Sequence, residues 1–200
     1  MKRNRKKKGK KKSRKKSGIG KVFLFLILIG IGLSMLYLFR QEIFDSLKPL
    51  LEKKGIVSGK RVVTLYFSDP EGEYLIGEKR KILKRDEAKE EAKETIIELI
   101  KGPKGKLIPT LPSRTKLLNL QLDQEKVAKV NFDQALIKDH PGGSSAEMMT
   151  LYSIVNSLTL NFPQIKRVQI LVEGREIETI AGHLALKKPV SPNPDLIRRQ

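Results

Sequence analysis

The sequence predicts an α+β fold: a mainly antiparallel sheet, two helices packed on one face of that sheet, and one transmembrane helix ahead of the domain. Three observations support this class. Between residues 61 and 186, short β-branched and aromatic runs alternate with turn-forming residues. Two longer stretches of the same segment repeat apolar residues at helical spacing. Residues 22–39 form an uncharged, apolar run.

The domain is expected to open with a β-hairpin and a helix. Residues 62–67 and 74–83 are rich in β-branched and aromatic side chains and are separated by turn-forming residues, so both are predicted strands. Gly77 inside the second strand indicates a β-bulge. Asp86 suits the N-cap of a helix over residues 87–101, which has one apolar face and ends at a Gly-Pro pair.

Four further strands are predicted, in two pairs. Residues 117–122 and 127–132 flank a short polar turn and are expected to form an antiparallel hairpin. Residues 168–172 and 177–180 flank a glycine turn and are expected to pair in the same way. The element order of the domain is therefore ββαββαββ.

The clearest helical pattern of the chain starts at Ser144. Ser144 and Glu147 have the spacing of a capping box. Apolar residues then recur at helical spacing and predict a stripe that faces the core. The stripe consists of Met148, Leu151, Tyr152, Val155 and Leu158.

Residues 1–39 have the pattern of a membrane anchor. Residues 1–21 are a basic tail with 13 Lys or Arg and no acidic residue. Residues 22–39 are long enough, as a helix of about 27 Å, to cross the hydrocarbon core of a bilayer. The positive-inside rule keeps the basic tail in the cytoplasm. We therefore expect a single-pass cell-membrane protein whose C-terminal domain is extracytoplasmic.

A cleavable signal peptide has the same order of basic and apolar residues and is the alternative to an anchor. The apolar run is longer than the core of a usual signal peptide. The residues at the C-terminal end of the run, 38–42, are bulky and charged, and no small-x-small cleavage site follows them. An uncleaved signal anchor is therefore favoured.

Two segments flank the predicted domain. Residues 40–60 are expected to be a stalk or linker, since Pro49 breaks their helical pattern and glycines follow. An interfacial amphipathic segment is the alternative interpretation of their apolar residues. Residues 187–200 contain three prolines and are expected to be a poorly ordered C-terminal tail.

The charge of the chain separates the tail from the domain. Its 41 Lys and Arg and 22 Asp and Glu give a formal net charge of +19. Residues 61–186 contribute almost nothing to this excess, with 19 basic and 18 acidic residues. A nucleic-acid-binding domain would carry a strong basic excess, so nucleic acid is not expected as a partner. The tail is instead expected to bind anionic lipid.

Catalytic, cofactor and metal sites are not expected, and the chain is predicted not to be an enzyme. The chain has no cysteine. Its two histidines, His140 and His183, are far apart in the sequence and each is isolated, so they do not predict a metal site. Asp139, His140 and Ser144 have the residue types of a Ser/His/Asp set. However, no G-x-S-x-G motif is present and Asp139 adjoins His140, so a turn leading into a capped helix is favoured.

Six segments of the domain resemble the GerMN domain of bacterial sporulation and spore-germination proteins, the GerM family. The resemblance covers nearly all of residues 61–186, and the order and spacing of the segments carry it. The segments are residues 63–67, 97–103, 107–112, 130–132, 142–147 and 180–183.

This resemblance implies an envelope protein with a ring-building-motif-like fold and no catalytic residues to carry over. It also implies protein partners or self-association in the envelope. The expected function is that of a membrane-anchored, non-enzymatic interaction or assembly module in sporulation or spore germination. A module that binds cell-wall polymer and an envelope hydrolase remain the alternatives. The hydrolase would need a nucleophile or paired carboxylates in a cleft.

Overall fold

The computed structural model describes residues 25–30, 34, 35, 37 and 56–198. The chain divides into two compact units, Met1–Leu50 and Leu51–Gln200. The described residues of the predicted anchor are helical. In the part of the chain that is described, no helix is long and apolar enough to cross a membrane. The basic tail, the rest of the predicted anchor and residues 40–55 lie outside the described residues.

The domain opens with the predicted hairpin, which forms a two-stranded antiparallel sheet. Strand β1 spans Ile56–Ser68 and strand β2 spans Leu75–Arg85. β1 thus begins inside the segment that was expected to be a linker. The predicted bulge at Gly77 is wrong, because the register is regular there and is irregular only between Ile56 and Lys60. Glycine is needed at this position for another reason, since a Cβ would lie 2.8 Å from the Thr64 Cγ2 atom.

A second, four-stranded sheet has the order β3-β4-β5-β6. Its strands are β3 (Leu117–Leu122), β4 (Val127–Phe132), β5 (Arg167–Val172) and β6 (Arg175–Glu176). The β3–β4 and β5–β6 pairs are antiparallel, whereas β4 and β5 are parallel. The helical segment between β4 and β5 provides the long connection that a parallel pair requires. The expected single sheet is therefore corrected to two sheets, one of them mixed.

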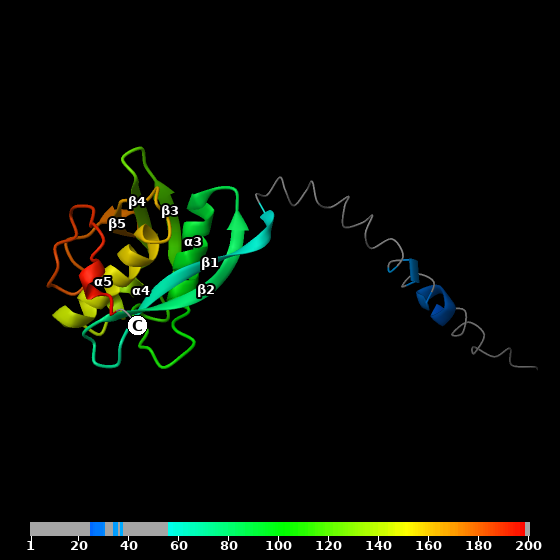
Figure 1. Cartoon of the computed structure of the whole chain (residues 1–200), viewed down its shortest axis with the longest axis horizontal. Coiled ribbons are helices and arrows are strands. Elements are labelled where there is room, and N and C mark those ends of the chain that lie inside the picture. The colour runs from blue at the N-terminus through cyan, green and yellow to red at the C-terminus, as the bar shows by residue number, and fades with distance from the viewer. Residues whose placement is uncertain (1–24, 31–33, 36, 38–55, 199–200) are drawn as a thin grey trace, which may run out of the picture. The chain divides into compact units, whose positions relative to one another are not determined.

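Two helices pack against both sheets. Helix α3 (Ala88–Ile100) contacts β1, β2 and β3, and helix α5 (Ser144–Thr159) contacts β1, β5 and α3. The short helix α4 (Ala135–Lys138), which sequence reasoning missed, lies between β4 and α5 in the chain, and a 3₁₀ turn, η1 (Pro194–Leu196), lies near its end. Figure 1 shows α3 and α5 in the body of the domain, with the hairpin on one side of it.

Helix α5 is buried on more of its surface than an amphipathic helix would be. Of the predicted stripe, Leu151, Val155 and Leu158 are buried, whereas Met148 and Tyr152 are only half-buried. The helix also buries polar side chains, namely Thr150, Ser153, Asn156 and Ser157. Buried polar groups require hydrogen-bond partners, and these side chains find theirs on neighbouring backbone segments.

Side chains of α5 and of Asn161 bind the edge of β1 that does not face β2. The Asn161 Oδ1 atom accepts the Thr64 N–H at 2.9 Å, and its Nδ2 atom donates to the Thr64 carbonyl at 2.6 Å. Further along β1, Ser157 accepts the Tyr66 N–H and Ser153 donates to the Tyr66 carbonyl. An edge strand normally offers these groups to another strand. Because side chains occupy them, the hairpin does not join the four-stranded sheet.

Replacing Asn161 with alanine is expected to lower the free energy of unfolding by about 1–3 kcal/mol, because the N–H and the carbonyl of Thr64 both lose their partner. Urea unfolding of a fragment spanning residues 51–200 would measure the change. Gln121→Ala, on the exposed side of β3, is the control and is expected to change stability by less than about 0.5 kcal/mol. Equal effects of the two variants would show that Asn161 does not hold the β1 edge.

The helix starts differ from the predicted caps. Helix α3 has Glu87 at its N-cap position and α5 has Gly143 there, and neither start has a side-chain cap bond. Asp86 is therefore not the cap of α3. Ser144 is the first helical residue of α5 and forms no capping box with Glu147. Gly143 has a φ of +85°, a backbone conformation that favours glycine.

The last described residues pack against the domain rather than forming a poorly ordered tail. Val190 exchanges two backbone hydrogen bonds with Val168 of β5. The buried amide of Asn156 donates to the Asn193 carbonyl and accepts the Asn193 N–H. The Arg198 N–H donates to the Leu75 carbonyl at the start of β2. These bonds explain why a proline-rich segment stays in place.

Candidate functional site

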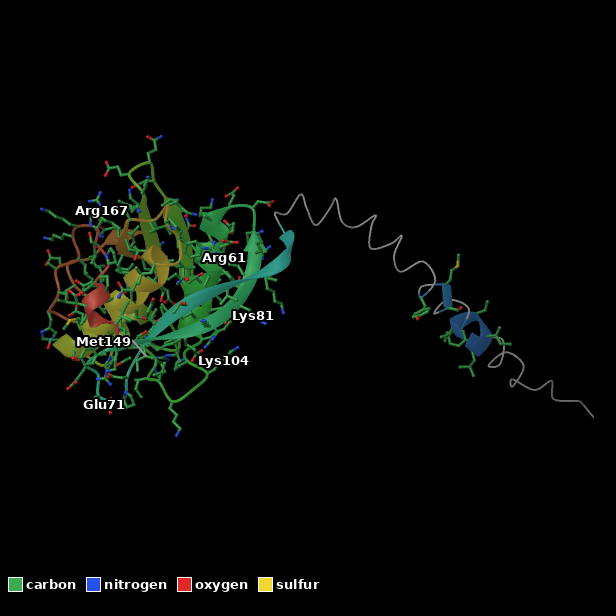
Figure 2. The ribbon with its side chains drawn as sticks, viewed as in Figure 1. Arg61, Glu71, Lys81, Lys104, Met149 and Arg167 are labelled. Atoms are coloured by element: carbon green, nitrogen blue, oxygen red, sulfur yellow. The ribbon has the colours of Figure 1, made fainter. Side chains whose placement is uncertain are left out.

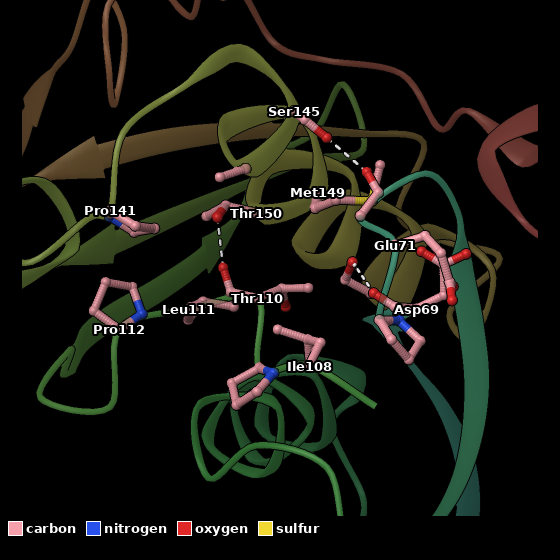
Figure 3. A pocket seen from close by; sticks show the side chains of 15 residues that line it. Asp69, Glu71, Ile108, Thr110, Leu111, Pro112, Pro141, Ser145, Met149 and Thr150 are labelled. Carbon is pink, nitrogen blue, oxygen red and sulfur yellow. Dashed lines mark hydrogen bonds between the residues drawn. The ribbon is translucent and has the colours of Figure 1, made fainter. Parts of the chain in front are cut away.

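A groove of about 360 Å³ lies where three chain segments meet (Figure 3). The first segment is the turn between β1 and β2, residues 68–72. The second is the proline-rich loop of residues 108–112. The third contains residues 141–150 and includes the first turns of α5. The walls are largely apolar and include Ile108, Pro109, Leu111, Pro112, Pro141, Ala146 and Met149.

Three hydroxyl groups in this groove donate to backbone carbonyls, and that of Thr110 pairs with the Ser153 hydroxyl. Ser145 donates to the Gly72 carbonyl at 2.6 Å and thereby joins the start of α5 to the β1–β2 turn. Thr150 donates to the Thr110 carbonyl, and Ser68 donates to the Asp69 carbonyl. Figure 3 draws these three bonds as dashed lines. The Ser145 and Thr150 bonds thus join different walls of the groove, the Ser68 bond lies within one wall, and none of the three hydroxyls donates to a base that would activate its oxygen as a nucleophile.

Asp69 lies in the groove wall but is committed to the β1–β2 turn. Its Oδ1 atom accepts the N–H groups of Glu73 and Tyr74, and its Oδ2 atom lies 3.3 Å from the Arg198 Nη2 atom. Burial acts to raise the pKa of Asp69, but these backbone hydrogen bonds and the Arg198 charge outweigh it and lower the pKa. The carboxylate therefore stays ionised and structural, which makes it a poor general base.

The structure does not join Asp139, His140 and Ser144 into a catalytic relay. Asp139 binds Arg114 through both carboxylate oxygens, at 2.9 and 2.7 Å. Ser144 is exposed at the start of α5. His140 instead contacts Thr150 and Gly142. This arrangement agrees with the interpretation of these residues as a turn ahead of a helix, although the cap itself comes from Gly143.

His140 connects the turn before α5 to the proline-rich loop. Its Nδ1 atom accepts the Gly142 N–H at 3.0 Å, which assigns the proton of the neutral ring to Nε2. Nε2 then donates to the Thr150 hydroxyl, 3.0 Å away, and Thr150 donates to the Thr110 carbonyl. Burial lowers the pKa of His140, and the nearby Glu147 charge offsets part of that effect.

The lowered pKa of His140 predicts a pH-dependent stability. Because the unfolded chain binds the proton more readily, the contribution is complete above the ordinary histidine pKa and is lost as pH falls toward the folded pKa. We expect the wild-type fragment to lose stability between about pH 7.5 and about pH 5.5, and His140→Gln to lose less over the same interval. Urea unfolding at both pH values would test this expectation. The control His183→Gln, at an exposed histidine, should keep the wild-type pH dependence.

Glu147 is the central residue that sequence reasoning misassigned. Its side chain is fully buried at the first turns of α5. Oε1 accepts the N–H groups of Ile180 and Ala181, at 2.8 and 3.0 Å, and the Thr179 hydroxyl. Oε2 accepts the His183 N–H at 2.8 Å. One carboxylate thus fixes residues 179–183 against α5, and no signal near Glu147 in the sequence distinguishes this role from a capping box.

The binding of backbone N–H groups by Glu147 explains why strand β6 is short. Residues 177–180 were expected to pair back on β5, but β6 ends at Glu176. The N–H of Ile180 goes to Glu147 instead of to a strand partner. A shallow hollow of about 410 Å³ lies beside this loop and is lined by residues 178, 179, 182–185 and 187. Among the described residues, no group of three or more His, Asp or Glu side chains is placed to hold a metal ion.

The family model named Germane, described as sporulation and spore germination, matches residues 64–178. The chain belongs to this family. The match confirms the resemblance seen in the six segments, and the structure shows how distant segments of that set meet. Residues 142–147 contact residues 180–183 through Glu147, and Thr110 of the proline-rich loop binds α5 through Thr150 and Ser153.

Solved structures of GerMN domains share the fold. The first GerMN domain of the sporulation protein GerM from Bacillus subtilis is 19% identical, with a TM-score of 0.54 over 66% of this chain and 97% of that chain. The tandem GerMN domains of the same protein are 17% identical, with a TM-score of 0.52 over 68% of this chain and 48% of that chain. A presumed lipoprotein from Clostridium perfringens is 28% identical, with a TM-score of 0.49 over 70% and 94%. The comparison with curated proteins gave no significant match.

Proposed function

We propose that this Germane-family protein is a membrane-anchored, extracytoplasmic interaction module of the cell envelope that acts without catalysis in sporulation or spore germination. The observation that carries the proposal is the order of segments along one chain. A basic tail and an uncharged 18-residue run precede a domain that matches the Germane model. Segments of this kind orient and retain a protein in the membrane.

The described helical residues of the predicted anchor support this proposal. Phe25 and Leu28, two large apolar side chains of these helical residues, are 63% and 59% exposed among the residues that the structure describes. A helix that presents apolar side chains on its surface requires an apolar environment. The hydrocarbon core of a membrane provides one.

The groove supports an interaction role rather than a catalytic one. Three of its hydroxyls donate to carbonyls, and its buried carboxylate Asp69 holds a turn and an arginine. A hydrolase of cell-wall polymer would need a nucleophile with a base, or two free carboxylates, facing the same space. The groove wall offers apolar surface, which suits contact with a polypeptide.

Protease treatment of intact protoplasts tests the topology. External protease should digest the domain, residues 56–198, and leave the basic tail in the cells. Protection of the domain would contradict the extracytoplasmic location. A mature protein that begins near residue 40 would contradict the anchor.

Cross-linking in the native envelope tests the interaction role. Full-length protein should cross-link into larger assemblies during sporulation or germination. A protein that remains an isolated monomer at every stage would contradict the assembly role. Loss of the phenotype in a stably folded Ser145→Ala variant with an unchanged cross-linking pattern would instead favour a catalytic role.

A further inference from the structure

The outward side of the β1–β2 hairpin combines lysines and apolar residues without any carboxylate. Register places Lys60 opposite Leu83, Val62 opposite Lys81, and Thr64 opposite Lys79. Directly opposed residues of an antiparallel pair share one face of the sheet. We call this surface the outer hairpin face. Its members are Lys60, Val62, Thr64, Tyr66, Gly77, Lys79, Lys81 and Leu83.

The described residues leave most of this face uncovered, since five of its eight members are exposed and only Thr64, Tyr66 and Gly77 are half-buried. Helices α3 and α5 pack against the hairpin where Val63, Leu65 and Phe67 are buried, and these residues alternate with those of the outer hairpin face. Val62 is 54% exposed and Leu83 is 42% exposed.

The charges of the outer hairpin face are also unopposed. Lys60, Lys79 and Lys81 are exposed, and across residues 56–198 none of the three forms an ion pair. Figure 2 labels Lys81 on the outward side of β2. The face is therefore a small cationic and apolar surface in a domain of nearly balanced charge.

We propose that the outer hairpin face docks on the anionic surface of the membrane that holds the anchor. This inference rests on the anchoring proposed above. Lysine ammonium groups are attracted to anionic lipid head groups. Lysine stems and the side chains of Val62 and Leu83 suit the boundary between head groups and hydrocarbon, where amphipathic surfaces bind.

The length of the segment between the predicted span and the domain allows the outer hairpin face to reach the membrane. Sixteen residues, 40–55, separate the predicted span from the start of β1. An extended chain of that length reaches at most about 55 Å. Because the tether raises the concentration of the face at the membrane, a weak surface contact is sufficient for docking.

The cysteine-free sequence allows a direct test on the full-length protein. Val62→Cys is labelled with an environment-sensitive fluorophore, and the protein is reconstituted in vesicles that carry a lipid-bound quencher. Leu118→Cys is the matched control, since Leu118 on β3 is a similarly exposed apolar residue at 48%. Vesicles containing phosphatidylglycerol are compared with vesicles of phosphatidylcholine alone. We expect quenching at Val62 only in the anionic vesicles and little quenching at Leu118 in either.

Charge reversal tests the cause of docking. Lys79→Glu combined with Lys81→Glu should reduce the quenching at Val62 about tenfold or more. Lys138→Glu combined with Lys166→Glu changes the net charge equally at two exposed lysines outside the hairpin and should leave the quenching unchanged.

The remaining outcomes separate the inference from the anchor on which it rests. Release of the protein from the vesicles by alkaline carbonate would overturn the anchor, and the docking with it. In vesicles that retain the protein, equal quenching at Val62 and Leu118, or quenching independent of lipid charge, would overturn the docking alone. In vesicles without the quencher, a change in Val62 fluorescence that grows with the protein-to-lipid ratio would assign the face to a second copy of the chain and overturn the membrane contact. Shielding of Val62 by soluble polyphosphate but not by anionic lipid would assign the face to an anionic polymer, with the same consequence.

Discussion

Replacing Glu147 with leucine is expected to lower the free energy of unfolding by about 3–5 kcal/mol. The carboxylate is fully buried and accepts three backbone N–H groups and the Thr179 hydroxyl. Leucine fills a similar volume but accepts no hydrogen bond, so four donors lose their partner inside the protein. Residues 179–183 should then detach from α5 before the rest of the domain unfolds.

Urea unfolding measures the total loss, and backbone hydrogen exchange locates it. Amides of residues 180, 181 and 183 should lose protection in Glu147→Leu, while amides of β4 keep it. Glu147→Gln retains one acceptor oxygen and should lose less stability than Glu147→Leu. The control Glu176→Gln, at an exposed glutamate of β6, should change stability by less than about 0.5 kcal/mol. A similar small change in Glu147→Leu would show that this carboxylate does not hold the loop.

The electrostatics of Glu147 add an acid-dependent part to this prediction. Burial alone would raise its pKa, but the Thr179 hydroxyl and the three amides outweigh burial and lower the pKa. A carboxylate with a lowered folded pKa stabilises the protein above its unfolded pKa, and that contribution is lost as pH falls below it. The difference between wild type and Glu147→Leu should therefore shrink below about pH 4.5.

Local sequence patterns predicted the elements of this fold because each pattern reports a nearby constraint. The alternation over residues 127–132 reflects a strand with one face in the core, and β4 has these bounds. The apolar spacing after Ser144 reflects a helix, and α5 begins there. Most of these features depend on residues that are close together in the sequence, so the sequence alone was sufficient to predict the elements.

The arrangement of the sheets could not be predicted in the same way. Asn161 stands 97 positions after Thr64, yet it binds both backbone groups of that residue. Nothing in the local sequence indicates that an asparagine beyond a helix replaces a strand partner. The separation of the two sheets follows from such long-range bonds, as does the early end of β6.

The same limit applies to the candidate site. The proline-rich loop and the Gly-Gly-Ser-Ser segment were recognised separately by resemblance, but only the structure brings them to one groove. His140 was identified and interpreted as part of a turn, yet its bond to Thr150 across the groove wall was not foreseen. Side-chain direction, rather than residue type, decides these contacts.

Arg80 is a second buried charged residue, and the apolar strand pattern around it does not indicate that it is buried. Its side chain is only 3% exposed, in a strand predicted from apolar residues around it. The guanidinium donates to Glu78 at 2.7 Å, to Glu98 at 3.1 Å and to the Gly102 carbonyl at 2.8 Å. It thereby ties β2 to the last turn of α3 and to the glycine that ends that helix. Burial alone would raise the pKa of Glu98, but Lys101 and Arg80 outweigh it and lower the pKa, so the Glu98 carboxylate remains charged.

Arg80→Leu is expected to lower the free energy of unfolding by about 3–5 kcal/mol, because two partly buried carboxylates and a carbonyl lose their shared donor. Arg80→Lys should recover only part of the loss, since an ammonium group cannot reach three acceptors with the geometry of a planar guanidinium. Urea unfolding of the domain, combined with a double-mutant cycle with Glu98→Leu, measures the coupling between the two side chains. The control Arg175→Leu, at an exposed arginine of β6, should be nearly neutral. If Arg80→Leu were equally neutral, or if the cycle showed no coupling, β2 and α3 would be held together by their apolar contacts alone.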